Sequence, residues 1–256
     1  MYQAHPTPYH TLVHIGAGAT ENAAQYRTPD LKRAVLIEPT PSLITAVTEE
    51  AAEQPNAEIL QKAVSDRNGR ANLSVFNLNT CNSLRKPTGI SAVYPGLKEI
   101  EKVKVSVVAA GELISSLNLA PDERHRLVIH APGEELSILR SLVSAKKLRG
   151  FEAVSVYCGN VPLYENGPSA DDICKLLYAE MFHIQEIPDA ETGPAMLNAI
   201  RNEARIDNER LKSQLEALKA ELVETERRIT LMDMEIAKSS AQLEMLKDLF
   251  ARETVK

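Results

Sequence analysis

A pair of glycines after a short apolar run is the first feature of this chain that could support chemistry. Gly16 and Gly18 stand in TLVHIGAGATENAAQY (11–26), between an expected strand and an expected helix. Glycine allows a tight turn and a close ligand approach, and the free amides of a helix start favour a negative or polar ligand. Glu38 ends the next apolar run, where a carboxylate can accept hydrogen bonds from both ribose hydroxyls of an adenosine. The combination predicts a nucleoside-binding site.

Glu21 narrows the type of cofactor. The dinucleotide fingerprint needs Gly or Ala at its sixth position, which Glu21 occupies here. An acidic side chain at that position crowds and repels a pyrophosphate, so NAD and FAD are disfavoured. S-adenosylmethionine carries no phosphate, and its nearby end is a cationic sulfonium that tolerates an acid. Glu21 is therefore less harmful to the binding of S-adenosylmethionine than to that of a dinucleotide.

Two histidines stand where neighbouring strands are expected to end. His14 lies in the first run, and His130 lies in RLVIHA (126–131). We expect these two strands to lie side by side in a doubly wound sheet, with their carboxyl ends at the cleft. A neutral histidine there could act as a general base, oriented by Glu134 or Glu135. Alternatively, the histidines and a glutamate could bind a metal ion, or the histidines could only pack. Acids in a first helical turn also complement the helix dipole, so both glutamates have a structural role open to them.

The elements that position these residues follow from hydrophobic periodicity. Short apolar runs alternate with helical patterns up to about residue 190, which predicts an α/β fold with a doubly wound, mostly parallel sheet. The expected strands are LVHI (12–15), RAVLIEP (33–39), EILQKAV (58–64), VKVSVVAA (103–110), RLVIHA (126–131), EAVSVYC (152–158) and FHIQEI (182–187). The expected helices lie at 21–27, 41–53, 111–117, 134–147 and 169–180. The Asn-Gly turn in SDRNGR (65–70) predicts a hairpin between NLSVF (72–76) and the strand before it.

The chain changes character after Pro194, since neither glycine nor proline occurs from Ala195 to Lys256. Apolar residues follow a seven-residue repeat, which predicts a coiled coil over 208–250, roughly 63 Å long at ~1.5 Å per residue. One set of positions holds Leu215, Leu222, Ile229, Ile236, Leu243 and Phe250; the other holds Leu211, Leu218, Met232 and Leu246, interrupted by Thr225 and Ser239.

So long an apolar stripe is expected to face a helix of a second copy or of a partner protein. A helix folded back on its own domain is the alternative, and it would bury only part of the stripe. In a parallel pair Arg228 would meet Asp233 favourably, whereas Glu221 would meet Glu226 unfavourably, so these charges leave the orientation open. Leu and Ile are mixed at one position of the repeat, which leaves the strand number open between two and three.

Composition excludes several functional classes. The 256-residue chain has a net charge of -6 and a pI of about 5.6, which does not suit a phosphate-binding surface, so no nucleic acid partner is expected. Cys81, Cys158 and Cys174 show neither a disulfide framework nor a zinc spacing, as in a reducing compartment. No signal peptide and no membrane-spanning run is visible, and we expect a cytoplasmic protein.

The same patterns suggest four segments along the chain. We expect a mobile tail at 1–10, a methyltransferase-like α/β domain at 11–190, a linker or helix start at 191–200 and a coiled coil at 201–252. The name given to the α/β domain rests on several short motifs that resemble the FkbM-type class I methyltransferases. They are HIGAGATE (14–21), IEPTP (37–41), AVSDRNG (63–69), NSL (82–84), VIHAPGEELSIL (128–139) and PLYENGPS (162–169).

The resemblance covers Thr11 to Ile187 and implies a Rossmann-like fold with S-adenosylmethionine as cofactor. It also implies methyl transfer to a hydroxyl group of a sugar or other small metabolite. Ser65 and Asp66 stand where members of the family often contact adenine, although SDRNG is equally a turn sequence. The predicted cofactor-binding residues are Gly16, Gly18, Glu38, Ser65 and Asp66.

The chain departs from the family at residues that set the charge of the site. The family usually has an acid where His14 stands, and an acidic run resembling Asp-x-Glu-Gly-x-Glu where this chain has HAPGEE (130–135). Gly133 and Glu135 match that run. Two acids would favour a cationic sulfonium, whereas two histidines would not, and protonated histidines would repel it. If the site is active, the candidate catalytic residues are His130, Glu135 and His14, with a histidine as the general base. We predict no metal in this site.

Three functions remain open at this point. The favoured hypothesis is an FkbM-like methyltransferase fold with impaired or lost catalysis, a possible pseudoenzyme that acts as an oligomerising or interaction module through its coiled coil. The alternative is an active S-adenosylmethionine-dependent O-methyltransferase that acts on a sugar or small metabolite. A third hypothesis is a module that binds S-adenosylmethionine or a nucleoside without methyl transfer.

Overall fold

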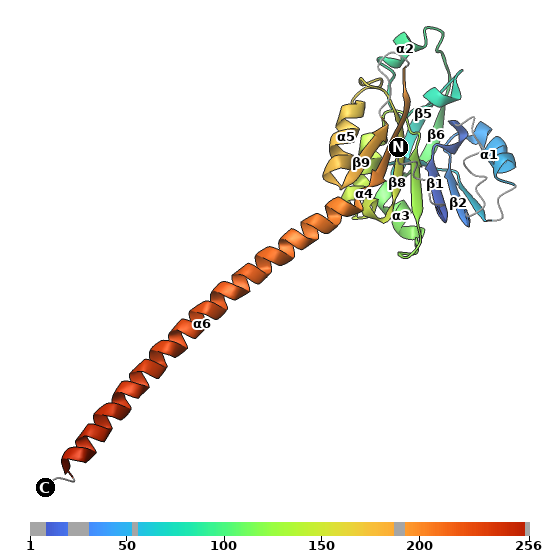
Figure 1. The fold of residues 1–256 in the computed structure, drawn as a ribbon. Helices are drawn as coiled ribbons and strands as arrows, with labels where there is room; N and C mark the ends of the chain where they lie inside the picture. The colour runs from blue at the N-terminus through green and yellow to red at the C-terminus, as the bar shows by residue number, and fades with distance from the viewer. Residues whose placement is uncertain (1–8, 20–30, 53–55, 187–192, 254–256) are drawn as a thin grey trace, which may run out of the picture. The chain divides into compact units, whose positions relative to one another are not determined.

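The computed structural model describes residues 9–19, 31–52, 56–186 and 193–253 (Figure 1). The chain divides into two compact units, Met1–Asn202 and Glu203–Lys256. The expected helix at 21–27, most of the expected tail at 1–10 and Glu21 lie outside the described residues. The first unit holds the α/β fold, and the second is a single helix.

A seven-stranded sheet forms the centre of the first unit, in the order β3-β2-β1-β7-β8-β10-β9. Its strands are β1 (Thr11–Ile15), β2 (Arg33–Ile37), β3 (Ala57–Leu60), β7 (His125–Ile129), β8 (Ala153–Cys158), β9 (Phe182–Glu186) and β10 (Ala195–Arg201). Neighbours from β3 to β8 are parallel, and β10 runs antiparallel to both β8 and β9. The predicted Rossmann-like, mostly parallel sheet is confirmed.

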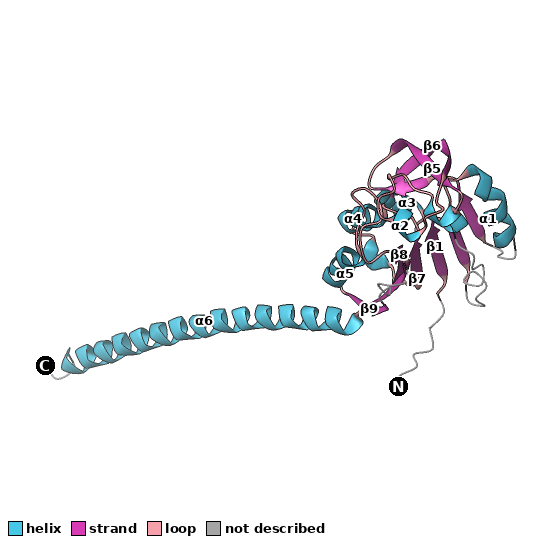
Figure 2. Ribbon diagram, turned by 90° about the horizontal axis from the view of Figure 1, so that it is seen from above, coloured by secondary structure: helices cyan, strands magenta, loops and turns pink. Residues whose placement is uncertain are grey.

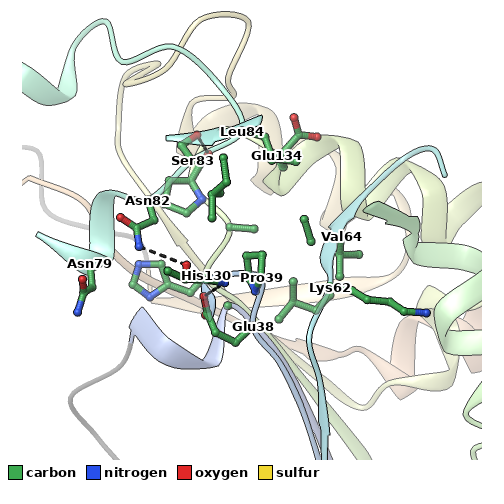
Figure 3. A pocket seen from close by; sticks show the side chains of 17 residues that line it. Glu38, Pro39, Lys62, Val64, Asn79, Asn82, Ser83, Leu84, His130 and Glu134 are labelled. Carbon is green, nitrogen blue, oxygen red and sulfur yellow. Dashed lines mark hydrogen bonds between the residues drawn. The ribbon is translucent and has the colours of Figure 1, made fainter. Parts of the chain in front are cut away.

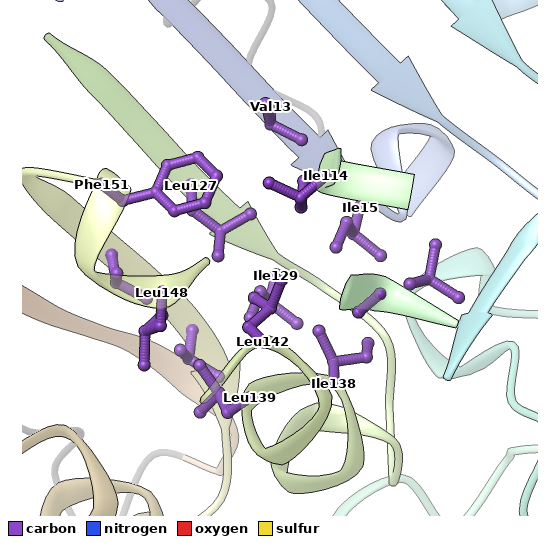
Figure 4. Packing of buried hydrophobic residues seen from close by; sticks show 14 of the residues in the cluster. Val13, Ile15, Ile114, Leu127, Ile129, Ile138, Leu139, Leu142, Leu148 and Phe151 are labelled. Atoms are coloured by element: carbon purple, nitrogen blue, oxygen red, sulfur yellow. The ribbon is translucent and has the colours of Figure 1, made fainter. Parts of the chain in front are cut away.

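Helices cover both faces of this sheet, which explains why its strands lack polar alternation. On one face Val13, Ile15 and Leu127 belong to a core that includes residues of α3 (Ala110–Ser116), α4 (Glu135–Ser144) and α5 (Ala170–Ala179) (Figures 2 and 4). On the other face Leu12, Leu36 and Val128 pack in a second core with residues of α1 (Ile44–Ala51). These four helices correspond to the patterns predicted at 41–53, 111–117, 134–147 and 169–180.

A separate three-stranded sheet corrects two predictions. It contains β4 (Ala63–Ser65), β5 (Gly69–Phe76) and β6 (Glu99–Ala109) in the order β4-β6-β5. The run at 58–64 is therefore two strands in two sheets, β3 and β4. The predicted hairpin is also wrong, because Val107 of β6 pairs with Ala63 on one edge and with Gly69 on the other. The long strand β6 lies between the two strands that the Asn-Gly turn connects.

The segment Ala195–Arg201 forms β10, so the predicted linker or helix start at 191–200 is wrong from Ala195 onward. Leu197 and Ala199 are buried and pair with Val156 and Val154 of β8. This period of two identifies a strand. It was hidden in the sequence because no glycine or proline separates the strand from the helix that follows.

The second unit is α6 (Glu203–Glu253), a continuous helix of 51 residues. Its described side chains, which end at Lys247, are almost all exposed. Short helical segments complete the first unit: α2 (Ile90–Val93), η1 (Ala17–Ala19), η3 (Pro41–Leu43), η4 (Asn79–Cys81) and η5 (Leu148–Gly150). Within the described part of the chain, no helix combines the length and the apolar character needed to cross a membrane.

The position of β10 predicts different outcomes for two truncations. A chain that ends after Asn202 loses only α6, and we expect its α/β unit to keep its free energy of unfolding within about 1 kcal/mol. A chain that ends after Pro194 also loses β10, which joins β8 to β9, and we expect it not to fold cooperatively. Urea unfolding followed by tyrosine fluorescence measures both, since the chain has seven tyrosines and no tryptophan. Cooperative unfolding of the shorter chain would contradict the expectation.

Candidate functional site

A pocket opens where β1, β2 and β7 end, at the edge of the sheet where ligands of doubly wound folds bind. Figure 3 shows side chains from separate segments around it, including Glu38 after β2, Asn82 after η4, His130 after β7 and Glu134 before α4. Gly16 lines the same pocket. The structure therefore brings together Gly16, Glu38 and His130 from the predicted set.

Glu38 uses its carboxylate to hold the backbone of the pocket. Oε2 accepts a hydrogen bond from the Gly18 amide at 2.9 Å, and Oε1 accepts one from the Thr40 amide at 2.8 Å. The residue is only 3% exposed, and this burial raises the pKa of its carboxyl group, although the hydrogen bonds act in the opposite direction. The oxygens predicted to accept bonds from ribose thus already accept bonds from the chain itself.

Gly16 serves the contact between β1 and β7. Its φ is +84°, and a Cβ added there would lie 1.8 Å from the carbonyl oxygen of His130. Its amide donates to the Ile37 carbonyl at 2.7 Å, and the His130 amide donates to the Ile15 carbonyl at 2.7 Å. Only glycine fits this close approach. The space in the direction of a Cβ is thus filled by the His130 backbone, although Gly16 also lines the pocket.

The two histidines occupy different surroundings, and both are neutral at neutral pH. His14 is fully buried opposite Val128 and does not line the pocket. Burial first, and the nearby His130 second, lower the pKa of His14 to about 3. Burial also lowers the pKa of His130 to about 4, although a 3.3 Å contact with the Thr80 carbonyl opposes the shift. The expected repulsion by protonated histidines is therefore absent, but neither histidine supplies negative charge.

Glu134 is the second acid of the pocket, and its charge is compensated. It is buried, it forms an ion pair with Arg85, and it accepts a hydrogen bond from the Ser65 hydroxyl at 2.6 Å. Ser65 is thus engaged with Glu134 and does not line the pocket. Asp66 is also outside the lining, in an exposed ion pair with Arg67 at 3.2 Å.

Glu135 lies in a second pocket, beyond Pro132 and Gly133, together with Tyr157 and Tyr164. Burial raises the pKa of its carboxyl group to about 8. Its buried Oε2 has no hydrogen-bond partner among the described residues. The structure thus separates Glu135 from the pocket that His130 lines, because adjacent residues at the start of α4 point into different cavities.

The residues around the first pocket do not fit a sulfonium donor. Its two acids are engaged, Glu38 by backbone amides and Glu134 by Arg85, and Lys62 adds a positive side chain to the lining. Each carboxylate of the described lining is therefore already hydrogen-bonded or ion-paired within the chain. The described residues also contain no group of three or more His, Cys, Asp or Glu side chains placed to hold a metal ion.

Arg85 and Lys62 are the site residues that the sequence interpretation missed. Arg85 follows the NSL motif, but it is 49 residues from Glu134, and no local pattern indicates that they pair. Lys62 lies in the break between β3 and β4, inside a run that was predicted as one strand. Asn82 and Ser83 of the NSL motif are structural in part: the Asn82 side chain accepts from the Phe76 amide, and the Ser83 hydroxyl donates to the Pro132 carbonyl.

No family model and no curated protein matches this sequence. Among solved structures, the chain is similar to a protein of the NADB-Rossmann superfamily from Streptococcus agalactiae, with 14% identity and a TM-score of 0.37 over 77% of this chain and 64% of that one. It therefore spans less than two thirds of that chain. It is also similar to magnesium protoporphyrin IX methyltransferase from Synechocystis PCC 6803, solved with bound SAM, with 11% identity and a TM-score of 0.37 over 76% and 71% of the two chains.

A third likeness is to the N-methyltransferase NodS from Bradyrhizobium japonicum WM9. It has 9% identity and a TM-score of 0.41, and it covers 76% of this chain and 86% of that one. All three TM-scores lie below 0.5. The strand order of the sheet, not these likenesses, therefore defines the fold.

Glu135 predicts a pH dependence of stability. Its folded-state pKa of about 8 lies above the ordinary 4.5, so its contribution to stability is complete below pH 4.5 and is lost as the pH rises to 8. The histidines, with lowered pKa values, affect stability only below about pH 6.5. Between pH 6.5 and 8 the free energy of unfolding of the parent protein should therefore fall by about 2 kcal/mol through this group. The Glu135→Gln variant, which cannot ionise there, should not show this fall.

Urea unfolding at pH 6.5, 7.2 and 8 measures this difference. Glu165→Gln is the matched control, because Glu165 is exposed and the change in side chain is the same. Parallel pH profiles of the parent protein and Glu135→Gln would show that the buried carboxyl is not protonated in the folded state.

Proposed function

We propose that this protein is a methyltransferase-fold interaction module in which methyl transfer is lost, and that it oligomerises through α6. The observation that carries the proposal is the state of the first pocket, where the groups expected to bind a cofactor are hydrogen-bonded to the chain. Both oxygens of Glu38 are bonded to backbone amides. A ligand would have to share or displace these bonds, and a buried polar group left without its partner costs about 1–3 kcal/mol.

Electrostatics supports the loss of catalysis. Methyl transfer from a sulfonium depends on a preorganised field at the reacting centre, and such fields are usually the largest single term in catalysis. Glu134 is paired with Arg85, and the formal charges of Glu38 and Lys62 cancel, so the described lining with Arg85 carries no net negative formal charge. Neutral His130 does not restore it.

The exposed stripe of α6 supports the oligomeric role. Nine apolar side chains of the repeat are between 50% and 64% exposed: Leu211, Leu215, Leu218, Leu222, Ile229, Met232, Ile236, Leu243 and Leu246. Full burial of such a side chain stabilises by about 1.5–3 kcal/mol relative to full exposure. Covering each of these half-exposed side chains therefore contributes on the order of 1 kcal/mol to the free energy of association. Pairing with a helix of a second copy or of a partner protein covers all of them.

One observation favours the alternative, an active O-methyltransferase. Gly16 and Glu38 line the same pocket at the strand ends, as a ribose-binding site requires. In that case Glu38 would accept the ribose hydroxyls through the remaining lone pairs of its carboxylate. Measurements of cofactor binding and methyl transfer separate the two functions.

We expect calorimetric titration of S-adenosylmethionine into the full chain to show no saturable binding with a dissociation constant below about 1 mM. That constant corresponds to a binding free energy of roughly −4 kcal/mol. The variants His130→Asp and His130→Asn form a matched pair, equal in size and different in charge. If missing negative charge limits affinity, the Asp variant should bind about tenfold more tightly than the Asn variant, which is about 1.4 kcal/mol.

Micromolar binding by the parent chain, with methyl transfer to an alcohol acceptor, would overturn the proposed loss of catalysis. Micromolar binding without transfer to any acceptor would instead support a module that binds the cofactor or a nucleoside.

For α6, we expect sedimentation velocity to show an oligomer for the full chain and a monomer for a chain that ends after Asn202. Ile229→Asp places a charge on the apolar stripe and should dissociate the oligomer. Thr230→Asp places the same charge one residue away, on the exposed side, and should leave the oligomer intact. A monomeric full chain, or an oligomeric chain without α6, would contradict the proposed role.

A further inference from the structure

We propose that α6 pairs with α6 of a second copy of this chain as a two-stranded, parallel, in-register coiled coil. This inference rests on the proposed function, and it adds the partner and the orientation. The apolar stripe fixes the heptad positions: Leu215, Leu222 and Ile229 mark position a, and Leu211 and Leu218 mark position d. The evidence for orientation lies in the polar residues within the stripe and in the charges beside it.

Polar residues interrupt the stripe at Asn208, Thr225 and Ser239. In a parallel, in-register pair each faces its own counterpart, so that hydroxyl meets hydroxyl and amide meets amide across the interface. In an antiparallel pair, position a faces position d. Thr225 would then face Ile236 or Ile229. Its hydroxyl, which donates to the Glu221 carbonyl at 2.9 Å, would meet no polar group on the other helix. Ser239 would likewise face a leucine.

The flanking charges favour the same orientation. In a parallel pair, position g of one helix meets position e of the next heptad on the other. Asp207 then meets Lys212 and Arg228 meets Asp233, and both contacts join opposite charges. Glu221 meets Glu226, which is the one like-charge contact among them. Opposite-charge contacts thus outnumber like-charge contacts.

The antiparallel arrangements have the opposite balance. In one register that overlaps nearly the whole helix, Lys212 meets Lys247 and Glu226 meets Asp233, and only Arg228 with Glu235 joins opposite charges. In the neighbouring register, one heptad away, like charges again predominate. Its like-charge contacts are Glu226 with Glu226, Arg228 with Arg228 and Glu221 with Glu235, against a single attractive contact of Lys219 with Asp233.

The residue types within the stripe indicate two strands. Ile229 and Ile236 are its only β-branched aliphatic residues, and both occupy position a, whereas leucines occupy three of the six d positions and isoleucine occupies none. β-branched residues at a with leucine at d favour a two-stranded coil, and an asparagine at a single a position, here Asn208, sets register and strand number. A parallel pair also brings the two Glu203 ends together, so that both α/β units start from one end of the coil.

Disulfide mapping in the full chain tests the orientation, in a Cys174→Ser background because Cys174 is the half-buried cysteine. Leu215→Cys, at position a, keeps Asn208 and should give a disulfide-linked dimer on oxidation. Ser213→Cys, at the outward position f, should not. A spin label on the Ser213→Cys variant should report a separation below about 30 Å in a parallel pair and above about 40 Å in an antiparallel one, given ~1.5 Å rise per residue.

The outcomes separate this inference from the proposed function. A monomeric full chain in sedimentation overturns both. An oligomer with the long label separation, or without the Leu215→Cys disulfide, overturns the parallel pairing and leaves the proposed oligomeric role standing. A mass of three copies overturns the strand number alone. A dimer with the disulfide and the short separation supports the inference.

Discussion

The buried carboxylate of Glu38 ties together the turns that follow β1 and β2. One oxygen accepts from the Gly18 amide and the other from the Thr40 amide, so a single side chain fixes both walls of the pocket at that end. Gly18 permits this contact, because a Cβ there would lie 3.0 Å from the Glu38 carboxyl carbon and 2.9 Å from the Leu43 side chain. The residues that suggest a ligand site, Gly16, Gly18 and Glu38, therefore also hold the turns after β1 and β2 in place.

The charge of the pocket also depends on contacts within the chain. Each acid that reaches it is engaged by a group of the chain: Glu38 by amides, Glu134 by Arg85. His14 and His130 do not make the pocket positive, because burial keeps both imidazoles neutral. His14 and His130 take the place of carboxylates at the ends of β1 and β7, so these two strands bring no negative charge to the pocket. The reason to expect weak binding of a cation is therefore missing attraction, not repulsion.

Much of the fold could be predicted from the sequence, because strands buried on both faces are continuous apolar runs. The adjacency of β1 and β7 followed from the doubly wound pattern, and their residues pair in register from Thr11 with His125 to Ile15 with Ile129. The place of β6 in a second sheet could not be predicted, since a strand carries no local mark of the sheet it joins. β10 was missed because its short alternation merges with the heptad region.

The site was less predictable because its contacts join distant segments. Gly16, Glu38 and His130 line one pocket, in agreement with the rule that parallel strands end at a common edge. The ion pair of Arg85 with Glu134 depends on a loop whose path the sequence does not reveal. Glu134 and Glu135 are adjacent, yet they line different pockets, since the turn around Gly133 sets the direction of each side chain.

The polar groups of the two units differ in where their partners lie. In the α/β unit the polar groups of the first pocket find partners within the chain, and little remains for a ligand. In α6 the residues within the apolar stripe, Asn208, Thr225 and Ser239, find suitable partners across an interface only when they face their own counterparts. Such polar layers lower the stability of a coil, but they penalise every arrangement that sets them against apolar side chains. A stripe built of leucine alone would pair more strongly and would select orientation less well.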